Sequence, residues 1–212
     1  MSWWKVVIGI VIIVSLGWLG WSVTRPMPGT RMEDQGREHV TPAAVAAFAY
    51  NSNPPTSGPH LPTWVKAGIF EMPQSEGELL HSLEHGYVVV SYNCNVHLKA
   101  FSRQLSAVSQ IYAHEEEGSP SVDFIDPTIS TGSGINETDR CTFLVKQLGE
   151  LANKKKLWKL IVVARPQLDT TIALTAWAYV DKFDPPAGGF DVGRIERFID
   201  YHRDQGPEKT ME

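Results

Sequence analysis

The chain has 212 residues and a formal net charge of −5 at pH 7. This length suits one globular domain with a full hydrophobic core, and the lack of excess positive charge argues against nucleic acid as a partner. Cys94 and Cys141 lack the CxxC spacing of a zinc ribbon or a thioredoxin-type site. They allow one disulfide, which would close the acidic stretch between them.

An uncharged, apolar run from Val6 to Val23 predicts a transmembrane helix, because about 20 such residues cross a bilayer core. Tryptophans stand toward both ends of the run, as is typical of the two membrane interfaces. A cleavable signal peptide is the competing interpretation, but its apolar region is usually shorter and no A-x-A-like site follows. We therefore expect an uncleaved anchor at residues 3–24, in contact with the lipid bilayer, and a tether at 25–38.

The rest of the chain predicts helices alternating with short strands. Expected helices cover 42–48, 76–85, 98–112, 141–155 and 192–203; expected strands cover 87–92, 160–164 and 172–180; expected loops cover 51–62 and 115–139. This order predicts one α+β domain at 39–208, an α/β sandwich with helices packed on a small mixed sheet.

Four histidines form a candidate metal site. His81 and His85 are four residues apart, so on a helix they lie on one face and can bind one ion. His60 ends a proline-rich loop whose restricted backbone would preorganise a third ligand, and His39 is a candidate fourth ligand. Imidazole suits transition metals, so the sequence predicts copper or zinc. Met72 lies between His60 and His81, and a thioether ligand would favour copper.

Other interpretations of these histidines remain open. Two histidines at a helix C-terminus can interact with the helix dipole alone. In a rival hypothesis the histidines only pack, and the chain is an accessory subunit of a larger membrane complex, in which small residues of the anchor allow close helix contact. These residues are Gly9, Ser15, Gly17 and Gly20. His97, His114 and His202 are interpreted as surface residues of helices.

The segment from His81 to His85 also matches H-x-x-E-H, the inverted zinc-peptidase pattern, in which Glu84 would be the general base of a hydrolase. That motif needs a long helix and a downstream carboxylate ligand. Here Gly86 ends the helix, and the acidic run Glu115–Glu117 is the candidate source of the carboxylate. Whether the protein is an enzyme stays open.

The chain resembles a bacterial family catalogued only as a domain of unknown function, whose members are typically small, membrane-anchored and extracytoplasmic. The matching stretches are Gly36-Arg37-Glu38-His39-Val40, Tyr50-Asn-Ser-Asn-Pro-Pro-Thr-Ser-Gly-Pro-His60, His81-Ser-Leu-Glu-His85-Gly86-Tyr87, Ile172-Ala-Leu-Thr-Ala-Trp177 and Gly206-Pro207-Glu208. The resemblance implies an exported domain with all four candidate histidines inside family motifs. It implies no particular activity.

The orientation of the predicted anchor rests on two opposing arguments. More Lys and Arg residues follow the apolar run than precede it, which favours a cytoplasmic C-terminus. A short N-terminus ahead of a long folded domain is the usual layout of a signal anchor. With the resemblance, we expect a single-pass protein of the bacterial cell membrane whose C-terminal domain lies on the periplasmic or extracytoplasmic side, where a disulfide is permitted.

Overall fold

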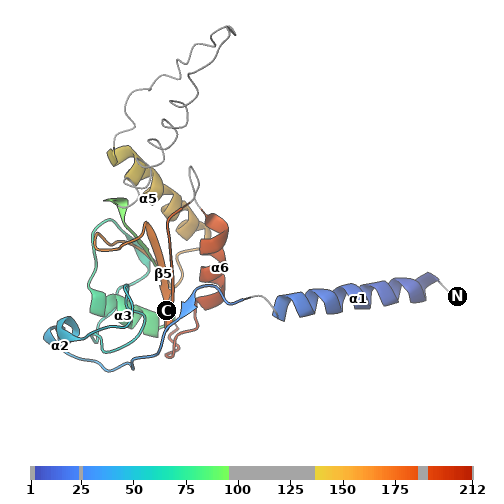
Figure 1. Cartoon of the computed structure of the whole chain (residues 1–212), viewed down its shortest axis with the longest axis horizontal. Helices are drawn as coiled ribbons and strands as arrows, with labels where there is room; N and C mark the ends of the chain where they lie inside the picture. Colours follow the sequence, from blue (N-terminus) through green and yellow to red (C-terminus); the bar gives the residue numbers. More distant parts are fainter. Residues whose placement is uncertain (1–2, 24–25, 96–136, 186–190, 212) are drawn as a thin grey trace, which may run out of the picture.

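The computed structural model describes residues 3–23, 26–95, 137–185 and 191–211. It is an α+β fold in which helices cover both faces of a six-stranded mixed sheet (Figure 1). The elements in chain order are α1 (Trp3–Val23), β1 (Thr30–Arg31), α2 (Pro42–Ala47), β2 (Gly68–Phe70), α3 (Glu76–Glu84), β3 (Val88–Tyr92), α5 (Glu137–Lys154), β4 (Leu160–Ala164), β5 (Ile172–Ala176), β6 (Tyr179–Phe183) and α6 (Val192–His202).

The sheet has the strand order β1-β6-β5-β3-β4-β2. Strand β4 runs parallel to both β3 and β2, while the other pairs are antiparallel. In the centre, Val90 is in register with Val162 on one side and with Leu174 on the other. Every residue of β3 is buried, which explains why its sequence is a continuous apolar run rather than an alternating pattern.

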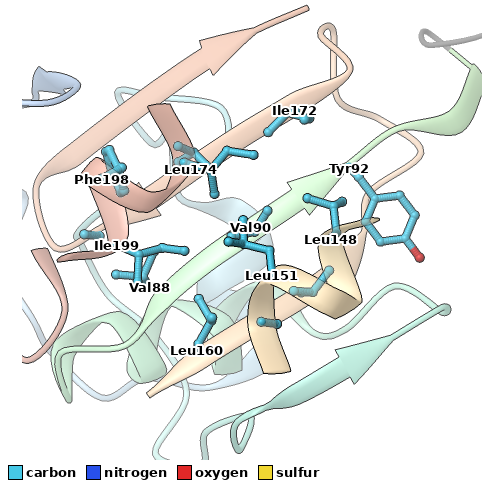
Figure 2. Packing of buried hydrophobic residues seen from close by; sticks show 14 of the residues in the cluster. Val88, Val90, Tyr92, Leu148, Leu151, Leu160, Ile172, Leu174, Phe198 and Ile199 are labelled. Atoms are coloured by element: carbon cyan, nitrogen blue, oxygen red, sulfur yellow. The ribbon is translucent and has the colours of Figure 1, made fainter. Parts of the chain in front are cut away.

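The two faces of β3 enter different core clusters, because successive side chains of a strand point to opposite faces. Val88 and Val90 pack with residues of α5 and α6, as Figure 2 shows. Val89 packs on the other face, with Leu80 and Leu83 of α3. Helix α3, which carries the candidate ligand His81, is therefore fixed to the sheet by its apolar side.

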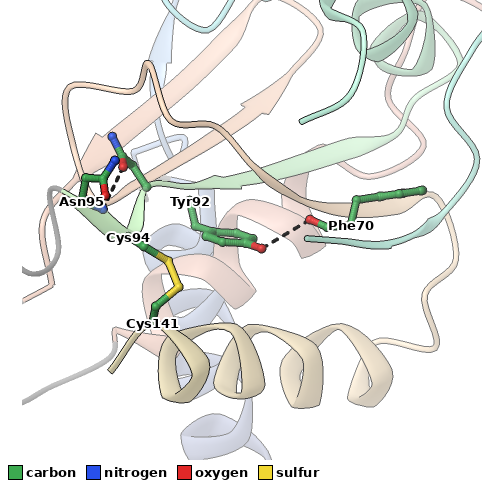
Figure 3. The surroundings of a disulfide bond; sticks show 6 residues. Phe70, Tyr92, Cys94, Asn95 and Cys141 are labelled. Atoms are coloured by element: carbon green, nitrogen blue, oxygen red, sulfur yellow. Dashed lines mark hydrogen bonds between the residues drawn. A yellow bond between two sulfur atoms is a disulfide. The ribbon is translucent and has the colours of Figure 1, made fainter. Parts of the chain in front are cut away.

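A disulfide joins Cys94, just after β3, to Cys141 in α5 (Figure 3). The two Cα atoms are 5.3 Å apart and the cysteines are 47 positions apart in the sequence. This confirms the predicted disulfide. Nearby, the Tyr92 hydroxyl donates a hydrogen bond to the carbonyl of Phe70 at 3.3 Å, which links the ends of β3 and β2.

The predicted transmembrane anchor at 3–24 is not supported. Among the helices of the described residues, none has both the length and the apolar character needed to cross a bilayer. Helix α1, Trp3–Val23, occupies most of the predicted range.

The predicted small sheet is also wrong, because the sheet has six strands rather than three. The expected strand at 172–180 is two strands, β5 and β6, with a turn that includes Ala178 at a φ of 59°. Strands β1 and β2 are two and three residues long and not buried, so neither carries an apolar pattern. Strand β1 lies within the stretch expected to be a tether.

The predicted helices agree better with the observed ones than the predicted strands do. Helices α2, α3 and α6 end within one residue of the predicted ends, whereas α5 begins at Glu137, inside a predicted loop. Thr41 caps α2 and Asp191 caps α6, each accepting a hydrogen bond from a backbone N–H in the first turn of its helix. The predicted helix at 98–112 and the loop from 115 to 136 lie outside the described residues.

Candidate metal centre

Helix α3 presents two of the candidate ligands toward the same region. Its first turn carries Glu76 and Glu78, which favour the positive end of the helix dipole. Its apolar residues are buried against the sheet, and His81 and Glu84 lie one turn apart. Gly86 has a φ of +82°, a conformation that favours glycine, and the helix ends there as predicted.

A short parallel ladder places His39 beside His60. The N–H of His60 donates to the carbonyl of Glu38 at 2.9 Å, and the N–H of Val40 donates to the carbonyl of His60 at 2.8 Å. Farther back, the N–H of Gly58 donates to the carbonyl of Gly36 at 2.7 Å. The two imidazole rings lie 5.0 Å apart, centroid to centroid. Two stretches that are distant in the sequence, 36–40 and 58–60, are thus joined by backbone hydrogen bonds.

His39, His60, His81 and Glu84 form the first group of candidate ligands. Each offers one ligand atom, and these four atoms all lie within 4.8 Å of one another. Nε2 of His60 is 2.9 Å from Oε2 of Glu84, and Nε2 of His39 is 3.7 Å from the same oxygen. His60 is fully buried and Glu84 nearly so, while the His39 side chain is about half exposed, at 48%.

His81 is held as a neutral imidazole. Its Nδ1 lies 2.7 Å from the carbonyl oxygen of Leu61, and because a carbonyl only accepts, Nδ1 carries the proton and Nε2 presents a lone pair. Burial lowers the pKa of His81, the Leu61 hydrogen bond opposes this, and the nearby His85, His60 and His39 lower it further. Nε2 of His81 is 3.0 Å from Nε2 of His85.

His81, His85 and Glu208 form the second group, again with ligand atoms within 4.8 Å of one another. Nε2 of His85 is 3.7 Å from Oε2 of Glu208. The segment from Asp204 to Thr210, named here the closing segment, brings Glu208 to this point. The N–H of Asp204 donates to the carbonyl of Gly86 at 2.8 Å, and the N–H of Glu208 donates to the carbonyl of Glu84 at 3.0 Å.

The predicted residues are therefore gathered, but not around one point. His39, His60 and His81 lie together with Glu84, whereas His85 lies in the second group, which shares His81. Sequence reasoning did not include Glu208 among the candidate ligands and considered Glu84 only as a general base. The stretch Gly206-Pro207-Glu208 was the available signal. Met72 is exposed to solvent, and Glu115–Glu117 lie outside the described residues.

His202 is buried, so its interpretation as a surface residue is wrong; His97 and His114 lie outside the described residues. One ring nitrogen, Nε2, donates to the carbonyl of Pro28 at 2.8 Å. The rings of Tyr179 and Phe198 lie 4.4 Å away, centroid to centroid. His202 faces the core of the domain because the periodicity that buries Phe198 and Ile199 also turns position 202 inward.

Because His202 is buried, we expect it to lower the stability of the folded domain at acidic pH. Desolvation lowers the pKa of His202, and the Pro28 hydrogen bond opposes the shift. The unfolded chain binds a proton at His202 near pH ~6.5 and the folded chain only at lower pH, so the free energy of unfolding falls as the pH drops below ~6.5. We expect H202Q to lose less stability than the wild type between pH 7 and pH 5, measured by urea unfolding with EDTA present. Equal losses would contradict this.

The fold and the two groups define an α+β domain with His/Glu clusters that could hold a metal ion. Residues 39–122 match a family described as a protein of unknown function, DUF3105. This match includes His39, His60, His81, Glu84 and His85 but not Glu208. No curated protein and no solved structure gives a significant match to the chain.

Proposed function

We propose that this domain binds one zinc or copper(II) ion through His39, His60, His81 and Glu84, and that it holds this ion outside the cytoplasm. Three imidazole nitrogens and one carboxylate are a ligand set that suits both metals. Both cysteines are in the disulfide, so no thiolate is available to favour copper(I). Four protein ligands fill a tetrahedral site, which favours storage, delivery or structural support over catalysis at the metal.

The observation that carries this proposal is the pair of acceptors around His60. Its Nδ1 lies 2.8 Å from the carbonyl oxygen of Gly58, and its Nε2 lies 2.9 Å from Oε2 of Glu84. Because the carbonyl of Gly58 only accepts, Nδ1 of His60 carries a proton and donates to it. A lone pair of Nε2 would then face a lone pair of the Glu84 oxygen, unless a proton or a metal ion lies between them. A metal ion would take the place of that proton, so metal binding should release protons.

The disulfide supports the proposed location. Disulfides persist in secreted and periplasmic proteins and are rare in the cytosol. A metal-binding domain on that side would meet metal ions before they enter the cell, or hold them there for another protein. The location therefore rests on Cys94 and Cys141, independently of any anchor.

The test compares two Glu→Gln variants of helix α3 in the full chain. We expect the wild type to hold about one equivalent of zinc or copper(II) after dialysis, measured by elemental analysis. Loss of a residue that only hydrogen-bonds to a metal ligand weakens metal binding by roughly 10–100-fold. Glu84→Gln should weaken metal binding by more than this, because it removes a ligand itself. Glu78→Gln is the control, since Glu78 lies on the same helix and bonds to Thr63 instead. A folded wild type that binds neither metal would overturn the proposal.

A hydrolase is the second candidate, and Glu208 is the observation that favours it. The H-x-x-E-H pattern needs a downstream carboxylate, and Glu208 lies with His81 and His85. An ion held by those three residues would have an open position for water, with Glu84 as the general base. In that case Glu84→Gln would keep the metal but lose hydrolysis of a peptide library, and Glu208→Gln would lose the metal.

A further inference from the structure

We propose that the ion occupies two alternative positions that share His81: it is captured by His81, His85 and Glu208, then passes to His39, His60, His81 and Glu84, where it is held. This inference rests on the proposed function and adds the route by which the site fills. It starts from the two overlapping groups, which have one residue in common.

The two positions cannot both hold an ion at once, because only one ring nitrogen of His81 is available to bind a metal. Its Nδ1–H is used by the carbonyl of Leu61, so only Nε2 can bind an ion. Two ligands of one ion with bonds of ~2.1 Å can be at most about 4.2 Å apart. His85 does not join the first group, so an ion there cannot also be bound by His85 unless side chains move.

The second group has distances close to those of a bound ion. Tetrahedral bonds of ~2.0–2.1 Å place neighbouring ligand atoms roughly 3.3 Å apart. Nε2 of His81 and Nε2 of His85 are 3.0 Å apart, and Nε2 of His85 is 3.7 Å from Oε2 of Glu208. Because the two positions share a ligand, an ion can pass between them by exchanging the others while it stays bound to His81.

The charged side chains beside each group determine which position an ion from solvent reaches first. The exposed side of the first group carries Arg37, whose Nη1 is 3.8 Å from Oε1 of Glu84 and whose side chain is 58% exposed. A cation approaching there meets a positive charge. The exposed side of the second group carries Glu208, with a 51% exposed side chain. The adjacent Lys209 is turned to Asp204, whose carbonyl accepts from Nζ at 2.7 Å.

The closing segment also couples the two groups mechanically. The backbone N–H of Glu208 is bonded to the carbonyl of Glu84, a ligand of the first group. Lys159 is buried and holds the same segment, donating to Asp204 and to the carbonyl of Thr210. Glu208 is therefore an exposed carboxylate on a well-anchored backbone, which suits a first contact for an arriving cation.

The experiment follows capture of cobalt(II), used as a coloured substitute for zinc, by stopped-flow absorbance of the full chain. Glu208→Gln should slow capture about tenfold at low salt, with a smaller effect at high salt, because a carboxylate at the entrance steers cations. Glu71→Gln, an exposed glutamate outside both groups, is the control. His60→Ala should still bind one equivalent through the second group with an altered visible spectrum, and His81→Ala should bind none.

Each result bears on one of the two proposals. Wild-type capture rates in Glu208→Gln, two equivalents bound at once by the wild type, or complete loss of binding in His60→Ala would overturn the two-position inference and leave the proposed function standing. A wild type that binds no metal overturns the proposed function itself. Wild-type-like binding by His81→Ala would overturn the sharing of that residue.

Discussion

Replacing Lys159 with methionine is expected to lower the free energy of unfolding by about 3 kcal/mol, near the low end for breaking a buried charge pair. Lys159 has a fully buried side chain, and its Nζ donates to the carbonyl of His85 at 2.9 Å, to Oδ1 of Asp204 at 2.7 Å and to the carbonyl of Thr210 at 2.9 Å. Methionine keeps the volume and removes all three donors. Water can reach Asp204, which is about one third exposed, but the carbonyl of His85 loses a buried, charged donor that water does not replace as easily.

The matched control is Lys154→Met. Lys154 forms an ion pair of the same length, 2.7 Å, with Glu196, but its side chain is 69% exposed. Exposed pairs contribute about 0–1 kcal/mol, so this variant should stay close to the wild type. The measurement is urea unfolding of both variants without metal. A similar small loss in both would show that burial of Lys159 adds nothing to the stability of the closing segment.

The sequence predicted the parts of this molecule that have a local signature. The spacing of His81 and His85, the glycine after them and the apolar run of β3 identify a helix that ends directly before a buried strand. The spacing of apolar residues in α6 is a local signature of the same kind. Lys159 was not singled out, because a buried lysine has no sequence pattern of its own; its burial depends on a segment 45 positions away.

The parts that were missed depend on contacts between distant segments. Strands β1 and β2 are too short to show a pattern and exist through pairing with β6 and β4. For the candidate site, spacing on one helix favoured His81 and His85 as joint ligands. The loop that carries His60 instead places it beside Glu84. The closing segment places Glu208 beside His85, which lies outside the first group.

Replacing Gly206 with alanine is expected to lower the free energy of unfolding by about 3–5 kcal/mol, because it detaches the closing segment. A Cβ at position 206 would overlap the carbonyl oxygen of Glu84 and the nitrogen of Gly86, and would lie 2.7 Å from the Cα of Gly86. All three atoms belong to the backbone at the end of α3, so no side chain can move aside. The segment must lift, and the hydrogen bonds of Asp204 and Glu208 to that backbone are lost.

Gly193→Ala is the control, since a Cβ there meets nothing closer than 3.9 Å and the residue lies inside α6. That variant should be neutral or more stable by up to about 1 kcal/mol. Gly206→Ala and Lys159→Met release the same segment, so the double variant should lose clearly less than the sum of the two single losses. Additive losses would mean that the two residues stabilise different parts of the domain, and that Glu208 does not depend on Lys159 for its place beside His85.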